Sequence, residues 1–246
     1  MTRRSREVGI IKACMVGVAL AATLAFPAQA QDKKLTLSGT AVLTTDYIFR
    51  GISNTDENPA VQASFDAAYG IFYAGIWGSN TDFGDGIELD YYAGIRPKWG
   101  NITFDIGGLY YNYPGGTFAD YVEVKAGATY AKGPWTLGVT NYWSPDFANA
   151  FGNSDAIEGG LGYTFGGKLF NFFTPTISGG VGFQSYEEVA DDYTYWNAGL
   201  TLGFMERWSA DVRYYDTDYN ETQCFDNSGG RSNCDARVVG TIKAVF

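Results

Sequence analysis

The chain has 246 residues, a formal net charge of −10 and no histidine, while aromatic residues make up 17% of it. The acidic balance argues against nucleic acid as a partner, because a phosphate backbone is bound by basic surfaces. Without histidine the chain lacks the most common general base and a principal metal ligand, so we expect no metal site and no cofactor.

The first thirty residues have the organisation of a secretory signal. Three arginines and a lysine form a basic start, an apolar stretch follows to Phe26, and Ala28–Ala30 supplies a small-residue cleavage site. This pattern predicts a signal peptide over residues 1–30 and an exported chain that begins near Gln31. A membrane anchor fits less well, because the apolar stretch is short and a cleavage site follows it.

After this segment, apolar and polar residues alternate with a period of two. Residues 60–69 are typical, with Val61 and Phe65 on one face and Gln62 and Asp66 on the other. Such alternation predicts β-strands with one apolar and one polar face. Twelve segments follow this pattern, at residues 35–49, 60–69, 71–79, 87–96, 101–111, 121–130, 135–143, 157–165, 174–185, 195–204, 208–216 and 236–246.

Two all-β folds compete for this pattern. A secreted sandwich turns its apolar faces inward, whereas a membrane barrel turns them outward. The even number of segments, each near the ~9–11 residues that cross a bilayer, favours the barrel. Aromatic residues at segment ends would form its interfacial girdles: Tyr69, Tyr130, Trp135, Tyr163, Phe165, Trp196, Phe204, Trp208 and Phe246.

The connections between segments support the same fold. Short turns that carry basic residues alternate with long loops that carry acidic ones, and both ends of residues 31–246 fall on the short-turn side. Outer-membrane barrels place short turns toward the periplasm and long loops outside the cell. We therefore predict an all-β fold, a transmembrane antiparallel up-and-down β-barrel of about 12 strands formed by residues 31–246.

Several stretches also resemble a known family. They are DYIFRGISNT (46–55), PAVQASFDAAY (59–69), FYAGIWGSN (72–80), IELDYYAG (87–94), YWSPDF (142–147) and the terminal DARVVGTIKAVF (235–246). Their order and spread resemble the TorF-type porin family of proteobacterial outer-membrane proteins, formerly known as conserved hypothetical proteins. The resemblance implies an outer-membrane barrel in a Gram-negative cell and a pore, but no particular solute.

Charged side chains on the predicted inner faces are the candidate site. The lumen-lining set contains seven acids and six bases: Arg50, Asp66, Glu88, Asp90, Arg96, Asp105, Glu123, Lys125, Glu158, Asp211, Arg213, Arg237 and Lys243. Opposed charges can set a transverse field that orients small polar solutes. The near balance predicts no strong ion preference, although the acidic outer loops would favour cations at the mouth.

Two functions follow from this interior. We predict a pore for passive or selective diffusion of small polar solutes. The alternative is a plugged structural or adhesive barrel, in which the same charges pair and fill the interior. Twelve strands lie between filled eight-stranded and open sixteen-stranded barrels, so strand number does not decide between them.

Patterns for other chemistry are incomplete. GYTFGGKL (162–169) lacks the Ser or Thr of a phosphate loop, and DTDYNE (216–221) has Glu221 where a calcium loop needs glycine. No nucleophile stands beside a base, so we expect no enzyme.

The C-terminal part adds two expectations. In an exported protein Cys224 and Cys234 are expected to form a disulfide. Phe246 ends an alternating strand, and this resembles the signal read by the outer-membrane assembly machinery. The expected partners are that machinery, outer-membrane lipid and lipopolysaccharide, and small solutes.

Overall fold

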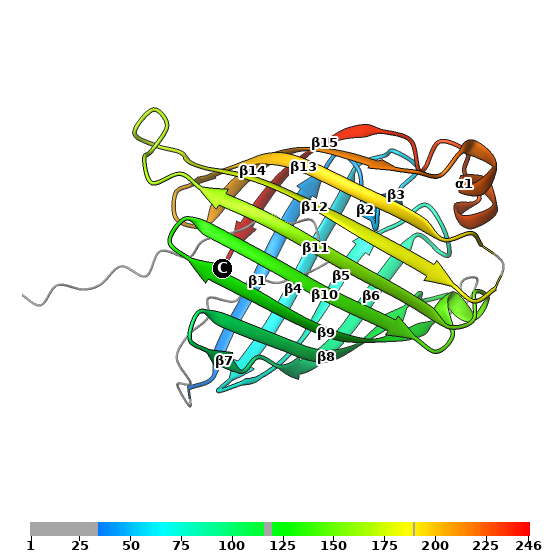
Figure 1. Ribbon diagram of the computed structural model, residues 1–246, viewed down its shortest axis with the longest axis horizontal. Coiled ribbons are helices and arrows are strands. Elements are labelled where there is room, and N and C mark those ends of the chain that lie inside the picture. The colour runs from blue at the N-terminus through cyan, green and yellow to red at the C-terminus, as the bar shows by residue number, and fades with distance from the viewer. Residues whose placement is uncertain (1–33, 116–119, 189) are drawn as a thin grey trace, which may run out of the picture.

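The computed structural model describes residues 34–115, 120–188 and 190–246; the predicted signal peptide, residues 1–30, lies outside them. Twelve long antiparallel strands form one closed barrel (Figure 1). No helix in the described part of the chain is long and apolar enough to cross a membrane. The strands are β1 (Thr36–Thr44), β4 (Ala60–Tyr69), β5 (Phe72–Asn80), β6 (Ile87–Ile95), β8 (Ile102–Asn112), β9 (Tyr121–Lys132), β10 (Trp135–Ser144), β11 (Ser154–Thr164), β12 (Thr174–Tyr186), β13 (Tyr193–Phe204), β14 (Trp208–Thr217) and β15 (Arg237–Val245).

The barrel closes where the last strand meets the first. β15 pairs with β1, with Val245 opposite Thr40. Phe246 continues this pairing through two backbone hydrogen bonds with Gly39, of 2.9 and 3.2 Å. Each long strand thus has a partner on both sides within the described residues, and the short β7 (Lys98–Trp99) adds to one edge of β8. The predicted all-β barrel of about 12 strands is confirmed.

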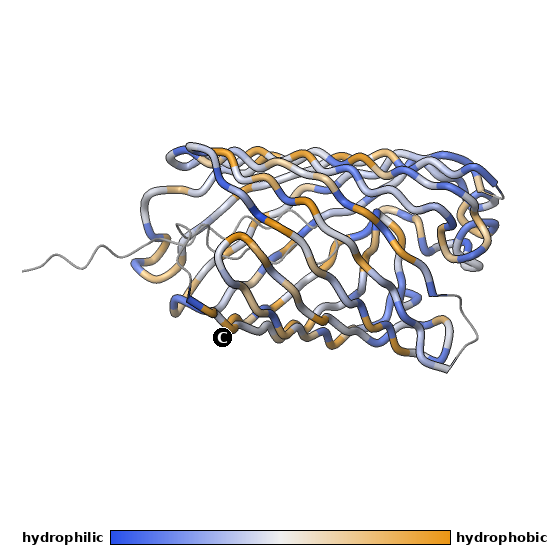
Figure 2. The backbone as a smooth tube through the Cα atoms, turned by 90° about the horizontal axis from the view of Figure 1, so that it is seen from below, coloured by the Kyte–Doolittle hydropathy of each residue, from blue (hydrophilic) through white to orange (hydrophobic). Residues whose placement is uncertain are grey.

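Alternation along the strands places apolar side chains outside and polar ones inside. On β4, Val61 and Phe65 expose 65% and 56% of their surface, while Asp66 exposes 1%. Hydropathy colours alternate in the same way along the wall in Figure 2. Exposed aromatic residues lie near both ends of the barrel, among them Tyr69, Phe72, Trp99, Trp135, Trp208 and Phe246 near the turns and Tyr91, Tyr110, Trp143, Trp196 and Tyr214 near the loops.

Glycine on the inner face makes room for large inward side chains. A Cβ on Gly182 of β12 would lie 2.2 Å from a ring carbon of Tyr195, and one on Gly107 of β8 would lie 2.5 Å from the Tyr73 hydroxyl oxygen. Only glycine permits such close approach of a backbone to a neighbouring side chain.

The two ends of the barrel differ. Turns and the C-terminus lie at one end, and the longer loops lie at the other, together with α1 (Glu221–Ser228) and the short helix η1 (Phe147–Asn149) (Figure 1). The turn formed by residues 165–173 is longer than predicted for that end. Helix α1 was not predicted either; Asn220 caps it by accepting hydrogen bonds from the backbone of Thr222 and Gln223.

The first predicted strand, residues 35–49, is wrong at its C-terminal end. β1 stops at Thr44, and residues 45–59, called loop 1 below, form a hairpin of β2 (Ile48–Phe49) and β3 (Ile52–Ser53). Arg50 and Gly51 make the turn of this hairpin with φ of 49° and 84°. Arg50 therefore reaches the interior from a loop and not from the barrel wall.

Candidate functional site in the barrel interior

Loop 1 places Arg50 between two walls of the barrel. Its guanidinium forms an ion pair with Glu123 of β9 at 2.8 Å. It also donates to the side-chain oxygen of Gln184 on β12 at 2.9 Å, and the Tyr193 hydroxyl donates to the Arg50 carbonyl oxygen at 3.0 Å. Arg50 is 6% exposed, so the hairpin fills the interior at this level.

Acidic side chains predominate in the half of the interior nearer the loops. Glu88 and Asp90 come from the loop end of β6, and Glu158 comes from β11; all three are buried. The Tyr47 hydroxyl donates to Glu88 at 2.9 Å. Burial and the nearby Glu88 and Asp90 carboxylates raise the pKa of Tyr47 well above its usual value, so this phenol remains a donor.

Basic side chains predominate in the half nearer the turns. Asp105 accepts hydrogen bonds from Arg96 and Lys125, both at 3.0 Å, and from the Tyr73 hydroxyl at 2.7 Å. The Arg96 guanidinium also lies 3.9 Å from the centre of the Tyr73 ring. Lys243 lies on β15, and the Asp66 carboxylate on β4 accepts hydrogen bonds from Tyr92 and Ser64.

A separate cluster surrounds Arg213 on β14. Its guanidinium donates to Asp211 at 3.1 Å, to the side-chain oxygen of Asn197 at 2.8 Å and to the Ser178 hydroxyl at 2.8 Å. The partners come from three strands that are neighbours in the wall. This cluster therefore lies along one side of the interior.

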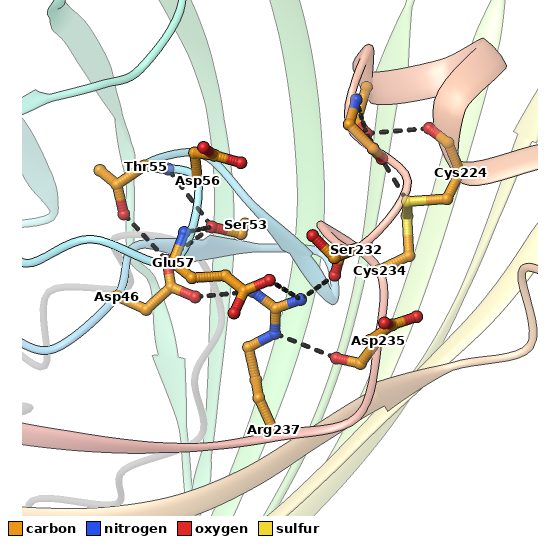
Figure 3. A network of polar contacts seen from close by, with 12 residues as sticks. Asp46, Ser53, Thr55, Asp56, Glu57, Cys224, Ser232, Cys234, Asp235 and Arg237 are labelled. Atoms are coloured by element: carbon orange, nitrogen blue, oxygen red, sulfur yellow. Dashed lines mark hydrogen bonds and ion pairs between the residues drawn. A yellow bond between two sulfur atoms is a disulfide. The ribbon is translucent and has the colours of Figure 1, made fainter. Parts of the chain in front are cut away.

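Arg237 ties loop 1 to the last strand and to the long loop before it, residues 218–236, called loop 6 (Figure 3). It donates to Asp46 at 2.9 Å and to the Ser232 carbonyl oxygen. Asp46 also accepts from Ser53 at 2.6 Å and Thr55 at 2.8 Å. The predicted disulfide between Cys224 and Cys234 is present and closes loop 6 over this network.

The structure thus brings most of the thirteen predicted charged residues into local clusters along the interior. Among the tyrosines that bond to the acids, Tyr47 and Tyr195 were not predicted as interior residues. The alternation within β13 would have placed Tyr195 on the inner face, whereas Tyr47 lies in loop 1, where the alternation continues but no longer distinguishes the two faces of the wall. In the described residues no group of His, Cys, Asp and Glu side chains is arranged to hold a metal ion.

Solved structures with the same architecture are porins. The KdgM porin superposes with a TM-score of 0.57 at 9% identity, covering 85% of this chain and 99% of that one. The NanC porin gives 0.52 at 11% identity, with 85% and 98% covered. A second KdgM structure, in complex with disordered oligogalacturonate, gives 0.56 at 8% identity, with 85% and 98% covered. At these identities the likeness concerns the fold alone.

Comparison at the level of sequence gives the family. Among curated proteins, none matches the chain. One family model does match, over residues 28–246, which includes every strand of the barrel. The chain therefore belongs to the Gcw_chp family, described as bacterial proteins of unknown function.

Proposed function

We propose that the protein is an outer-membrane pore for small polar solutes in which loop 1 forms the constriction. The closed barrel, with an apolar exterior and a charged interior, supports a transmembrane location. The resemblance to the TorF-type porin family and the fold shared with the KdgM and NanC porins support transport.

The observation that carries the proposal is how loop 1 is held. Aromatic residues of loop 1 pack on the wall, Tyr47 on Trp77 and Phe49 on Tyr111. Its polar contacts are those of Arg50 with Glu123 and Gln184 and of Asp46 with Arg237. Water and polar solutes can replace such contacts, whereas an apolar plug would resist hydration. The hairpin is therefore suited to act as a constriction that solutes pass or displace.

The distribution of charge supports a preference among ions. Toward the loops the interior contains the acids Glu88, Asp90, Glu123 and Glu158, and Arg50 pairs with Glu123. Arg96, Lys125 and Arg213 pair with acids nearer the turns, and Arg237 pairs with Asp46 in loop 1. An entrance lined by one sign of charge concentrates ions of the opposite sign. We expect the pore to prefer cations.

Conductance of the purified, refolded protein in a planar bilayer tests the proposal. The wild type should give discrete steps, and the reversal potential in a salt gradient should indicate cation preference. Replacing both partners of the buried ion pair, R50A/E123Q, should increase the step size because it empties the constriction without leaving an unpaired charge. The exposed Arg231 of loop 6 provides the control, since R231A should leave the steps unchanged.

The alternative is a plugged structural or adhesive barrel, and one observation favours it. Arg50 and Glu123 are 6% and 1% exposed, so no water-filled passage runs between them in this conformation. A wild type and an R50A/E123Q variant that both insert and both fail to conduct would reject the pore and leave this second function.

Other parts of the proposal concern partners and chemistry. Outer-membrane lipid, lipopolysaccharide and the assembly machinery would be the partners of the exterior and of Phe246. We propose no enzymatic activity, because the chain has no histidine to act as a general base. Residues 1–30 would be removed as the signal peptide, which the N-terminal sequence of protein purified from outer membranes would test.

A further inference from the structure

A cavity of about 150 Å³ lies at the loop end of the barrel, beside Phe49 of the loop 1 hairpin. It is bounded by loop 1, by loop 6 and by the other loops at this end. Among the described residues that line it, two are acids, Asp56 and Asp82, and none is a lysine or an arginine. Eight of its lining residues are aromatic: Phe49, Phe83, Tyr113, Tyr121, Phe147, Phe151, Tyr186 and Tyr193.

Most of these rings form one continuous arc from loop to loop. Phe83 contacts Tyr113 with ring centres 5.5 Å apart, and Tyr121 contacts Phe147 at 4.6 Å. Tyr113 joins Tyr121 at 6.5 Å, Phe147 joins Tyr186 at 5.6 Å, and Tyr186 joins Tyr193 at 6.4 Å. Neighbouring rings restrict one another's motion, so a ligand would contact an ordered aromatic wall.

Two rings of this aromatic wall contact a cation, the side chain of Arg50. The Arg50 guanidinium carbon lies 4.7 Å from the centre of the Phe49 ring and 5.9 Å from that of Phe147. Both distances are in the range of cation–π attraction. Glu123 balances the charge of Arg50, whereas Asp56 and Asp82 are exposed and have no basic neighbour in the cavity lining.

We propose that this cavity binds a small organic cation with a flat, delocalised head, of the amidinium or guanidinium type. The carboxylates of Asp56 and Asp82 accept hydrogen bonds from such a head, and the ring faces attract its charge. The volume suits the size, since an engineered cavity of about this volume admits benzene. The site does not depend on whether the barrel conducts.

Charge and shape separate this ligand from other candidates. A neutral sugar could stack on the rings but would gain little from two carboxylates in a lining without a base. An anion would be repelled by both. The cavity therefore favours a cation over a neutral molecule of the same shape.

Three probes of nearly equal shape test the proposal by titration calorimetry of the refolded protein in detergent. Benzamidine is a cation, benzamide is neutral and benzoate is an anion. Benzamidine should bind, benzamide should bind about tenfold more weakly or worse, and benzoate should give no heat of binding. Equal binding of benzamide, or no binding of benzamidine, would overturn the proposal.

Two variants locate the site. D56N/D82N should lower the affinity for benzamidine about threefold or more and leave the affinity for benzamide unchanged. The control D226N/D235N removes two exposed acids outside the cavity and should change neither affinity. F83L should lower the affinity for benzamidine, whereas F225L, which alters an exposed ring on α1, should leave it unchanged. Unchanged benzamidine affinity in both D56N/D82N and F83L would place the binding elsewhere and refute this site. Normal heat-modifiable migration on a gel would establish that each variant is folded.

Discussion

Five acids inside the barrel accept a hydrogen bond from a tyrosine hydroxyl: Asp66, Glu88, Asp105, Glu123 and Glu158. A phenol satisfies a buried carboxylate without cancelling its charge, which a lysine or arginine would do. The ring also fills space with few rotatable bonds. At the scale of single residues, tyrosine thus gives Glu88 and Glu158 a hydrogen-bond donor without adding a positive charge to the interior.

Such rings need glycine opposite them, and this gives a prediction for Gly182. A methyl group there would overlap the ring of Tyr195, so G182A should displace Tyr195 from Glu158 and lower the free energy of unfolding by about 1–3 kcal/mol. Urea unfolding of the refolded protein, followed by fluorescence, measures the loss.

The matched control is G159A on β11. Its added Cβ would meet nothing closer than 3.9 Å, so its stability should stay within about 0.5 kcal/mol of the wild type. Equal stability of G182A and G159A would contradict the packing argument.

Loop 1 and loop 6 act together at the scale of elements. Arg237 joins them through Asp46 and the Ser232 carbonyl oxygen, and the disulfide holds the segment that follows α1. The Ser53 amide also donates to the Asn233 carbonyl oxygen at 2.8 Å. Loop 6 therefore forms a cover that keeps the loop 1 hairpin in position.

Removal of the disulfide should loosen this cover but not the barrel. We expect C224S/C234S to keep the heat-modifiable gel shift, because all twelve long strands pair independently of loop 6. Trypsin should cut after the exposed Arg231 several-fold faster in the variant, since a loop of this length loses a constraint of about 3 kcal/mol or less. Equal cleavage rates in the two proteins would show that the disulfide does not order loop 6.

At the scale of the whole molecule, the sequence predicted the wall well because every residue in a strand has only two directions to face. Glu88 and Asp90, two positions apart, are therefore expected on the same face, and both side chains are buried. Loop 1 was not predicted, because the alternation continues through residues 45–49 although the chain has left the wall. Its position depends on partners distant in sequence, such as Glu123 and Gln184, and no local pattern contains that information.

Phe246 lies at the seam where β15 meets β1, and this gives the last prediction. The residue contributes two backbone hydrogen bonds to Gly39 at the seam and an aromatic ring that is 63% exposed. Deletion of Phe246 removes both, whereas F246A removes only the ring and F246Y keeps both. Because an unpaired strand edge is unfavourable in lipid, we expect the deletion to reduce the amount of folded protein in outer-membrane fractions several-fold and F246Y to have no effect.

The amount of folded F246A protein in these fractions separates the role of the ring from that of the backbone bonds. A level close to that of the deletion would mean that the assembly machinery reads the ring, and a level close to the wild type would mean that the seam alone matters. Normal insertion of the deletion variant would refute both roles.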